Sequence, residues 1–283
     1  METKIIGIAG AGTMGSGIAQ VAAEAGFQVI MRDLEEKFVQ RGLTAVEKNL
    51  QRAVDKGKKS RDEADAVLSR IKGTTSIEDF SGVDFVIEAV VENMDLKKEL
   101  YKKLDAVCKS GTILASNTSG LSITEMAAAT GRPQKVVGMH FFNPVPVMKL
   151  VEVIRGFDTD DETFDLTMEL SRKLGKEPIA VKEAPLFAVN RILVPMINEA
   201  AFVLMEGIAS AEDIDRGMML GANHPIGPLA LGDLVGLDVL LAVMETLYRE
   251  TADSKYRPCP LIRKLVRAGH FGRKTGRGFY TYE

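Results

Sequence analysis

The amino-terminal part of the chain alternates between short apolar runs and longer amphipathic stretches. The apolar runs predict buried strands at 4–9, 27–31, 71–75, 85–90, 113–116, 136–142, 148–154 and 178–181. Apolar residues at helical spacing separate several of these runs and predict helices at 16–25, 95–108, 122–129 and 160–174. Alternating strands and helices predict an α/β fold with a doubly wound sheet.

Two regions depart from this alternation. The highly charged segment 35–70 predicts a helical excursion, with two helices broken near 55–60 that project from the sheet. After residue 184 no strand pattern remains, and helices are predicted at 188–206, 211–220, 228–249 and 261–268. We therefore expect one domain at 1–184 and a second, all-α domain at 185–283. Helix 188–206 is apolar nearly all round, so it packs within its own domain or against a second copy in a homodimer.

Composition narrows the class of protein. The 283 residues are 46% hydrophobic and 27% charged, which is typical of ordered globular domains. The net charge of −3 argues against a nucleic-acid-binding protein. Neither a secretory signal nor a membrane-length apolar run is present, so we expect a cytoplasmic protein without a membrane partner. The two cysteines and three histidines lack metal-ligand spacing, and no metal site is expected.

A glycine-rich segment lies between the first predicted strand and the first helix. It reads GAGTMG and matches the GxGxxG pattern in the strand–turn–helix context that a dinucleotide site requires. Glycines allow the tight turn and a close backbone approach to a pyrophosphate, which the helix amino terminus then binds. A Rossmann-type site is favoured over a purely structural turn. Its candidate contacts are Gly10, Gly12, Thr13, Met14 and Gly15.

Asp33 ends the second predicted strand, where a carboxylate can bind the ribose hydroxyls of NAD. The same charge would repel a 2′-phosphate, so NADP is less favoured as the cofactor. The adjacent Arg32 weakens this argument, because an arginine can pair with a 2′-phosphate. The alternative is that Asp33 only caps the following helix.

The segment 136–154 carries an acid/base candidate. Its two predicted strands flank Asn143–Pro146, and a hairpin with Phe142 opposite Met148 would place His140 and Glu152 on one face as diagonal neighbours. A carboxylate bonded to one imidazole nitrogen leaves the other nitrogen ready to exchange a proton. From spacing alone, a buried histidine with only a structural role is an equal alternative.

Several motifs together resemble those of the L-3-hydroxyacyl-CoA dehydrogenase family. They are GAGTMG at 10–15, VEN at 91–93, SNTSGLSIT at 116–124, HFFNPVPVMKLVEVI at 140–154, VNR at 189–191, NHPIGP at 223–228 and GRKTGRGFYTY at 272–282. The resemblance spans essentially the whole chain, and it favours the catalytic interpretation of His140 and Glu152.

The resemblance also implies roles for further residues. Ser119 and Asn190 would complete the catalytic site by holding the substrate oxygen, although each can instead serve a helix start. Cofactor contacts are implied for Glu92, Lys97, Asn117, Ser119, Asn143 and Lys274. Substrate contacts are implied for Ser119, Asn190, Asn49 and Lys56, the last two lying in a charged segment that a solvated helix face explains equally well.

The implied reaction is hydride transfer between NAD and C3 of an acyl-CoA, interconverting acetoacetyl-CoA and 3-hydroxybutyryl-CoA in fermentation or fatty acid metabolism. Two alternatives remain open: a dehydrogenase of a free hydroxy acid, and a non-catalytic structural or nucleotide-sensing protein. Three residues depart from the family pattern, namely Leu186, Ala188 and Gly120. Leu186 would be strained if its position requires a positive φ. These departures bear on the acyl-chain range more than on the reaction.

Overall fold

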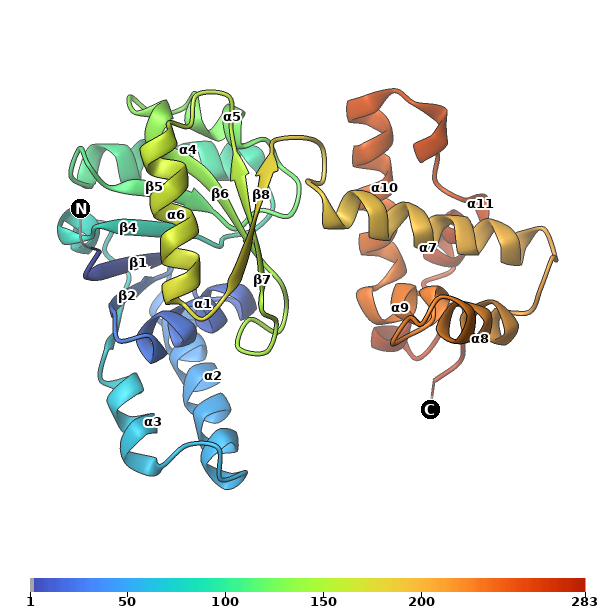
Figure 1. Cartoon of the computed structure of the whole chain (residues 1–283), viewed down its shortest axis with the longest axis horizontal. Helices are drawn as coiled ribbons and strands as arrows, with labels where there is room; N and C mark the ends of the chain where they lie inside the picture. The colour runs from blue at the N-terminus through green and yellow to red at the C-terminus, as the bar shows by residue number, and fades with distance from the viewer. Residues whose placement is uncertain (1–2, 283) are drawn as a thin grey trace. The chain divides into compact units, whose positions relative to one another are not determined.

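A computed structural model describes residues 3–282 of the chain. The chain divides into two compact units, Met1–Ala184 and Pro185–Glu283 (Figure 1). The first combines a sheet with helices, and the second is built from helices and short turns. Among the described residues, no helix combines the length and apolarity needed to cross a membrane.

One eight-stranded sheet forms the framework of the first unit. Its strands, in spatial order, are β3 (Ile71–Thr74), β2 (Gln28–Arg32), β1 (Ile5–Ala9), β4 (Phe85–Glu88), β5 (Ile113–Ser116), β6 (Val136–Phe141), β7 (Leu150–Arg155) and β8 (Glu177–Lys182). Neighbouring strands are parallel except at β6 and β7, which are antiparallel. The predicted doubly wound α/β fold is confirmed. The strand order reverses its direction at β1 and β4, which is where such folds bind ligands.

Helices cover both faces of this sheet, with α6 across one face and α4 behind the other (Figure 1). The helices are α1 (Thr13–Glu24), α4 (Met94–Val107), α5 (Ile123–Ala127) and α6 (Asp161–Lys173), with short 3₁₀ turns η1 (Glu78–Gly82) and η2 (Pro133–Lys135). Asn93 and Asp160 cap α4 and α6 by accepting backbone N–H groups of the first turn. Apolar residues of the strands, such as Ile6 and Ile8, are wholly buried beneath them.

The charged excursion forms a helical hairpin that projects beyond the sheet (Figure 1). It consists of α2 (Glu36–Asp55) and α3 (Arg61–Leu68), as the predicted break near 55–60 requires. Ser60 begins α3 with a capping box, because its hydroxyl accepts the Glu63 N–H while the Glu63 carboxylate accepts the Ser60 N–H. The apolar stripe of α2 packs on α1, which leaves its charged face in solvent.

The second unit contains α7 (Val189–Met205), α8 (Ala211–Gly221), α9 (Pro228–Val235), α10 (Leu237–Thr251) and α11 (Pro260–Arg267), with turns η3 (Ser254–Tyr256) and η4 (Arg273–Thr275). The predicted single helix at 228–249 is wrong. Gly236 has φ +104°, outside the helical region, and it separates α9 from α10. The Leu237 N–H leaves the helical pattern and donates to the Phe271 carbonyl.

Two buried aspartates fasten the segment 279–282 to the helices of this unit. The Asp233 carboxylate accepts the N–H groups of Phe279 and Tyr280 at 2.9 and 3.0 Å and the Tyr282 hydroxyl at 2.9 Å. The Tyr280 hydroxyl donates to Asp215 at 2.8 Å. Asp215 also accepts backbone N–H groups from the first turn of α9. The core of this unit therefore depends on contacts made by its last residues.

The segment joining the two units is strained. Leu186 and Phe187 have φ values of +61° and +58°, in the left-handed region that side chains with a Cβ rarely adopt. Leu186 is nevertheless 3% exposed and belongs to the apolar core of the second unit. The departure at Leu186 therefore places a leucine at a position that favours glycine, and its burial opposes the backbone strain.

Candidate functional site

The glycine loop connects β1 to α1 at the carboxyl edge of the sheet. A Cβ added to Gly15 would lie 1.9 Å from the Gly10 carbonyl oxygen, so close packing of loop and helix requires glycine there. A Cβ added to Gly12 would meet no protein atom within 4 Å. Gly12 is therefore not needed to avoid a clash within the protein. Its missing side chain leaves open space, which a pyrophosphate bound close to the backbone requires. Thr13 and Met14 begin α1 beside this space.

Asp33 follows β2 and is joined directly to the glycine loop. Its Oδ2 accepts the Ala11 N–H at 2.8 Å, and its Oδ1 accepts the Leu34 N–H at 2.7 Å. Helix α2 begins one residue further on, with Glu35 at its cap position. The alternative in which Asp33 caps this helix is therefore wrong. The two backbone bonds fix the carboxylate and leave each oxygen able to accept a further bond.

A cavity of about 540 Å³ opens at the carboxyl ends of β1, β2 and β4. Its lining includes Gly10, Gly12, Asp33 and Phe38, together with apolar residues after β4. Free N–H groups of a helix amino terminus, a fixed carboxylate and an apolar wall are the features that an adenosine diphosphate moiety needs. The residues present therefore fit the predicted NAD.

His140 on β6 and Glu152 on β7 form a buried pair on adjacent antiparallel strands of the same sheet. The distance from His140 Nδ1 to Glu152 Oε2 is 2.8 Å, and the residues are 5% and 0% exposed. Because a carboxylate only accepts hydrogen bonds, Nδ1 donates to it. The predicted register was wrong by two residues: His140 lies directly opposite Glu152, with Phe141 opposite Val151. The shared face was predicted correctly, since a shift of two residues conserves the side of the sheet.

The backbone around His140 is held by residues from neighbouring elements. Asn117 Oδ1 accepts the Phe141 N–H at 2.9 Å, which ties the segment after β5 to β6. The buried Lys176 ammonium donates to the Val145 and Met148 carbonyls at 2.5 and 2.9 Å and so fastens the loop after His140. Burial lowers the pKa of Lys176. The exposed Asn143 lies in this loop, and its cofactor contact stays a prediction.

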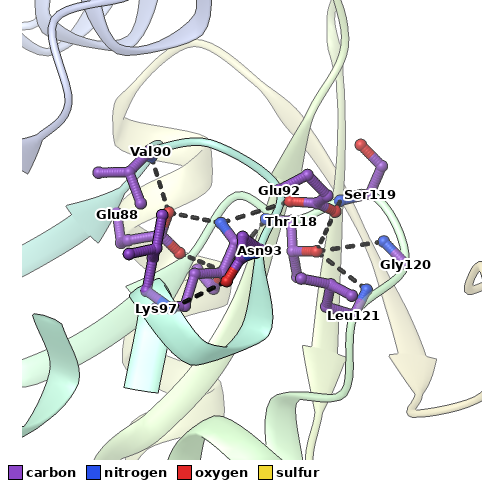
Figure 2. A network of polar contacts seen from close by, with 11 residues as sticks. Glu88, Val90, Glu92, Asn93, Lys97, Thr118, Ser119, Gly120 and Leu121 are labelled. Atoms are coloured by element: carbon purple, nitrogen blue, oxygen red, sulfur yellow. Dashed lines mark hydrogen bonds and ion pairs between the residues drawn. The ribbon is translucent and has the colours of Figure 1, made fainter. Parts of the chain in front are cut away.

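Glu92, Lys97 and Ser119 belong to one polar network (Figure 2). Glu92 Oε1 accepts the Ser119 N–H at 3.1 Å, and Lys97 Nζ lies 3.4 Å from Glu92 Oε2. The Ser119 side chain is exposed, whereas Lys97 is 1% exposed. The nearest carboxylate to Lys97 Nζ is Glu88 Oε1, at 2.6 Å. Lys97 therefore reaches this loop through Glu92, and its contact with a cofactor stays a prediction.

The other predicted site residues lie elsewhere in the two units. Asn49, on α2, donates to Gln20 Oε1 of α1 at 3.4 Å, and Lys56 is exposed at the end of α2. Asn190 is in the first turn of α7. Lys274, in η4, forms an ion pair of 2.6 Å with Asp238. The roles assigned to these residues stay predictions.

Sequence reasoning missed Glu88 and Lys176. Glu88 ends a strand in which every residue is buried. An ionisable residue in a run predicted to be a buried strand signals a perturbed environment, and this signal was available. Lys176 had no comparable sequence signal, because its two acceptors are backbone carbonyls about thirty residues away.

The glycine loop, the fixed Asp33 and the buried imidazole–carboxylate pair define a Rossmann-type NAD-binding oxidoreductase. Comparison with family sequence profiles agrees. The 3-hydroxyacyl-CoA dehydrogenase NAD binding domain matches residues 5–184, and the C-terminal domain of the same family matches residues 187–282. The chain belongs to the 3-hydroxyacyl-CoA dehydrogenase family.

Individual relatives match over nearly their whole lengths. The chain is 53% identical over 277 residues to the 3-hydroxybutyryl-CoA dehydrogenase of Clostridioides difficile, covering 98% of this chain and 99% of the relative. It is 43% identical over 287 residues to human mitochondrial hydroxyacyl-coenzyme A dehydrogenase, covering 99% and 91%. The crystal structure of (S)-3-hydroxybutyryl-CoA dehydrogenase from Ralstonia eutropha has a TM-score of 0.98, with 55% identity and full coverage of both chains.

Proposed function

We propose that the chain is an NAD-dependent (S)-3-hydroxybutyryl-CoA dehydrogenase that interconverts acetoacetyl-CoA and 3-hydroxybutyryl-CoA. The observation that carries the proposal is the buried His140–Glu152 pair on β6 and β7, in the same sheet as the glycine loop. The relatives that match over their full lengths support the same substrate.

His140 would act as the acid/base in this reaction. The nicotinamide, when bound, accepts the hydride from C3 of the hydroxyacyl thioester or returns it to the ketone. Because Nδ1 faces Glu152, the hydroxyl proton passes to Nε2 of His140 during oxidation and returns from it during reduction. The Glu152 carboxylate stabilises the imidazolium formed in between and keeps the ring in one tautomer.

Ser119 would hold the substrate oxygen where negative charge develops, since its hydroxyl is exposed while its backbone is fixed by Glu92. Asn190 is proposed for the same oxygen on the strength of the family resemblance. Asn49 and Lys56 are proposed for the coenzyme A moiety, where an exposed ammonium would pair with a phosphate.

A spectrophotometric assay tests the substrate. Oxidation of NADH is followed with acetoacetyl-CoA and, separately, with free acetoacetate. We expect turnover of the thioester and little with the free acid. Lys56→Gln should raise KM for acetoacetyl-CoA and leave turnover of any free acid unchanged. Faster reduction of the free acid would favour the hydroxy-acid dehydrogenase instead.

The same assay with NADPH tests the role of Asp33. A carboxylate fixed beside the glycine loop repels a 2′-phosphate, so we expect NADH to be strongly preferred. Equal rates with the two cofactors would refute this assignment, and Arg32 would then be the residue to examine. Arg32 Nε already donates to the Thr75 carbonyl at 3.2 Å, which holds its guanidinium in place.

A cytoplasmic homodimer is also proposed. Cys108 and Cys259 are both buried with free thiols, as expected in a reducing compartment. The second unit exposes large apolar side chains, among them Ile192 at 73% and Leu220 at 75%, which a second copy would cover. Sedimentation at micromolar concentration tests this, and a monomer would refute the dimer.

A further inference from the structure

A buried ion pair lies at the carboxyl end of β4. Lys97 Nζ and Glu88 Oε1 are 2.6 Å apart, and the two side chains are 1% and 0% exposed. Glu88 also accepts the Val90 N–H at 2.7 Å and the Ser116 hydroxyl at 2.6 Å. Burying two charges is costly, and an apolar pair of similar volume usually stabilises a protein as well or better. Stability alone therefore does not explain why this pair is present.

The pair continues into a second carboxylate. Lys97 Nζ lies 3.4 Å from Glu92 Oε2, and Glu92 is 46% exposed. Glu92 Oε1 in turn accepts the Ser119 N–H and the Thr118 hydroxyl. One ammonium is thus shared between a buried carboxylate and one that holds the loop bearing Ser119.

Thr118 extends the network along this loop. Its hydroxyl donates to Glu92 and accepts the N–H groups of Gly120 and Leu121 at 3.3 and 2.9 Å (Figure 2). The backbone N–H groups of Ser119, Gly120 and Leu121 therefore all donate either to Glu92 or to the Thr118 hydroxyl, which itself donates to Glu92. The Ser119 hydroxyl remains exposed at the centre of this fixed loop.

We propose that Glu88, Lys97 and Glu92 form a charge relay that positions Ser119, with Glu88 as its buried anchor. This inference rests on the proposed function, in which the Ser119 hydroxyl holds the substrate oxygen. Glu88 is a positioning residue because it is wholly buried and reaches the loop through other groups. One route runs through Lys97 and Glu92, and a second runs through the Ser116 hydroxyl, which donates to Glu88 and accepts the Thr118 N–H at 3.2 Å.

The distances explain why the anchor matters. Lys97 Nζ is 0.8 Å closer to Glu88 than to Glu92, from 2.6 Å against 3.4 Å. Glu88→Gln removes the nearer charge while conserving shape. The ammonium then moves towards Glu92, because an unpaired buried charge is costly. Glu92 is drawn away from the Ser119 N–H, and the loop loosens.

Hydrogen exchange tests the relay without any substrate. In Glu88→Gln we expect the N–H groups of Ser119, Gly120 and Leu121 to exchange about 10-fold faster than in the unmodified protein. The matched control is Thr112→Val. It removes a buried hydrogen bond of 2.8 Å from the Thr112 hydroxyl to the Val83 carbonyl, just before β5 begins and at the opposite end of that strand from Ser119. The control should leave these three groups unchanged. Unchanged exchange in Glu88→Gln would overturn the relay whatever reaction the protein catalyses.

A double-mutant cycle tests whether Glu88 affects catalysis through Ser119. Glu88→Gln should lower kcat for acetoacetyl-CoA reduction by about 10- to 100-fold, because a misplaced group near the reacting atoms lowers the rate. In a Ser119→Ala background the same substitution should have almost no further effect on kcat. An equal loss in both backgrounds would show that Glu88 acts generally on stability and would overturn the positioning role.

A second pair of variants covers the case in which Glu88→Gln folds poorly. Thr118→Val removes the hydroxyl that links Glu92 to the loop, and Thr118→Ser keeps it. We expect Thr118→Val to lower kcat and Thr118→Ser to retain it. In a Ser119→Ala background, Thr118→Val should cause no further loss of kcat. Equal activity of the two would overturn the relay. Failure of the unmodified chain to reduce acetoacetyl-CoA would instead refute the proposed function, and the exchange experiment would still decide on the relay.

Discussion

Replacing Glu152 with glutamine separates charge from shape at the proposed acid/base pair. Glutamine conserves the volume of the wholly buried side chain and can still form a hydrogen bond to His140 Nδ1. It loses the negative charge that stabilises an imidazolium, and its amide can select the wrong tautomer. We therefore expect NADH to bind normally and turnover to fall.

The magnitude follows from the geometry. With Nδ1 and Oε2 2.8 Å apart, the centres of the two charges are separated by about 4 Å. At an effective dielectric constant of about 20, their attraction is about 4 kcal/mol. Since about 1.4 kcal/mol corresponds to a tenfold change, losing most of this attraction should lower kcat by about 100- to 1000-fold.

Steady-state NADH oxidation with acetoacetyl-CoA measures kcat, and quenching or enhancement of NADH fluorescence measures binding. The matched control is Asp84→Asn, another carboxylate-to-amide change in the first unit. Asp84 accepts the N–H groups of Lys4 and Ile5 near the start of β1, away from the carboxyl edge. The control should lose stability and keep kcat. A fall of less than about threefold in Glu152→Gln would refute the electrostatic argument.

Three further predictions concern stability. Lys176→Met leaves two loop carbonyls without their ammonium donor and should lower the free energy of unfolding by about 2 kcal/mol in urea titrations, whereas equal stability would show that the loop holds itself. Burial and the Asp233 carboxylate raise the pKa of Tyr282 to about 12. The neutral Tyr282 hydroxyl therefore contributes fully to the free energy of unfolding below the unfolded pKa of about 10, and this contribution is lost as pH rises through about 12. Tyr282→Phe should accordingly reduce the alkaline decline of the melting temperature, and an unaltered decline would contradict this. Leu186→Gly relieves about 1–2 kcal/mol of strain but loses a larger burial term of about 3 kcal/mol, so differential scanning calorimetry should show net destabilisation.

The sheet and its helices could be predicted because hydrophobic periodicity is a local property. The hairpin register could not be, since it depends on the turn. In the loop between β6 and β7 the Pro144 carbonyl accepts the N–H groups of both Val147 and Met148, which lengthens the connection. The period of two still placed His140 and Glu152 on one face, so the pair was found despite the wrong register.

Breaks and buried charges were harder to predict than elements. Gly236 lies within an apolar pattern that continues on both sides of it. The helix is interrupted there because the Leu237 N–H donates to the carbonyl of Phe271, which is far along the chain. Glu88 and Lys97 are nine residues apart on a strand and the next helix, and only the packing of that helix brings them together. Contacts that depend on how one element packs on another leave no periodic signal in the sequence.

The way in which Asp233 and Asp215 hold residues 279–282 has a consequence for biosynthesis. The first unit is a continuous segment with its own core, so it can fold while the rest of the chain is still being translated. The second unit cannot complete the hydrogen bonds of Asp215 until Tyr280 has left the ribosome, nor those of Asp233 until Tyr282 has done so. We therefore expect the NAD-binding part of the protein to be formed first, and the helical part to become protease-resistant only after translation has passed that residue.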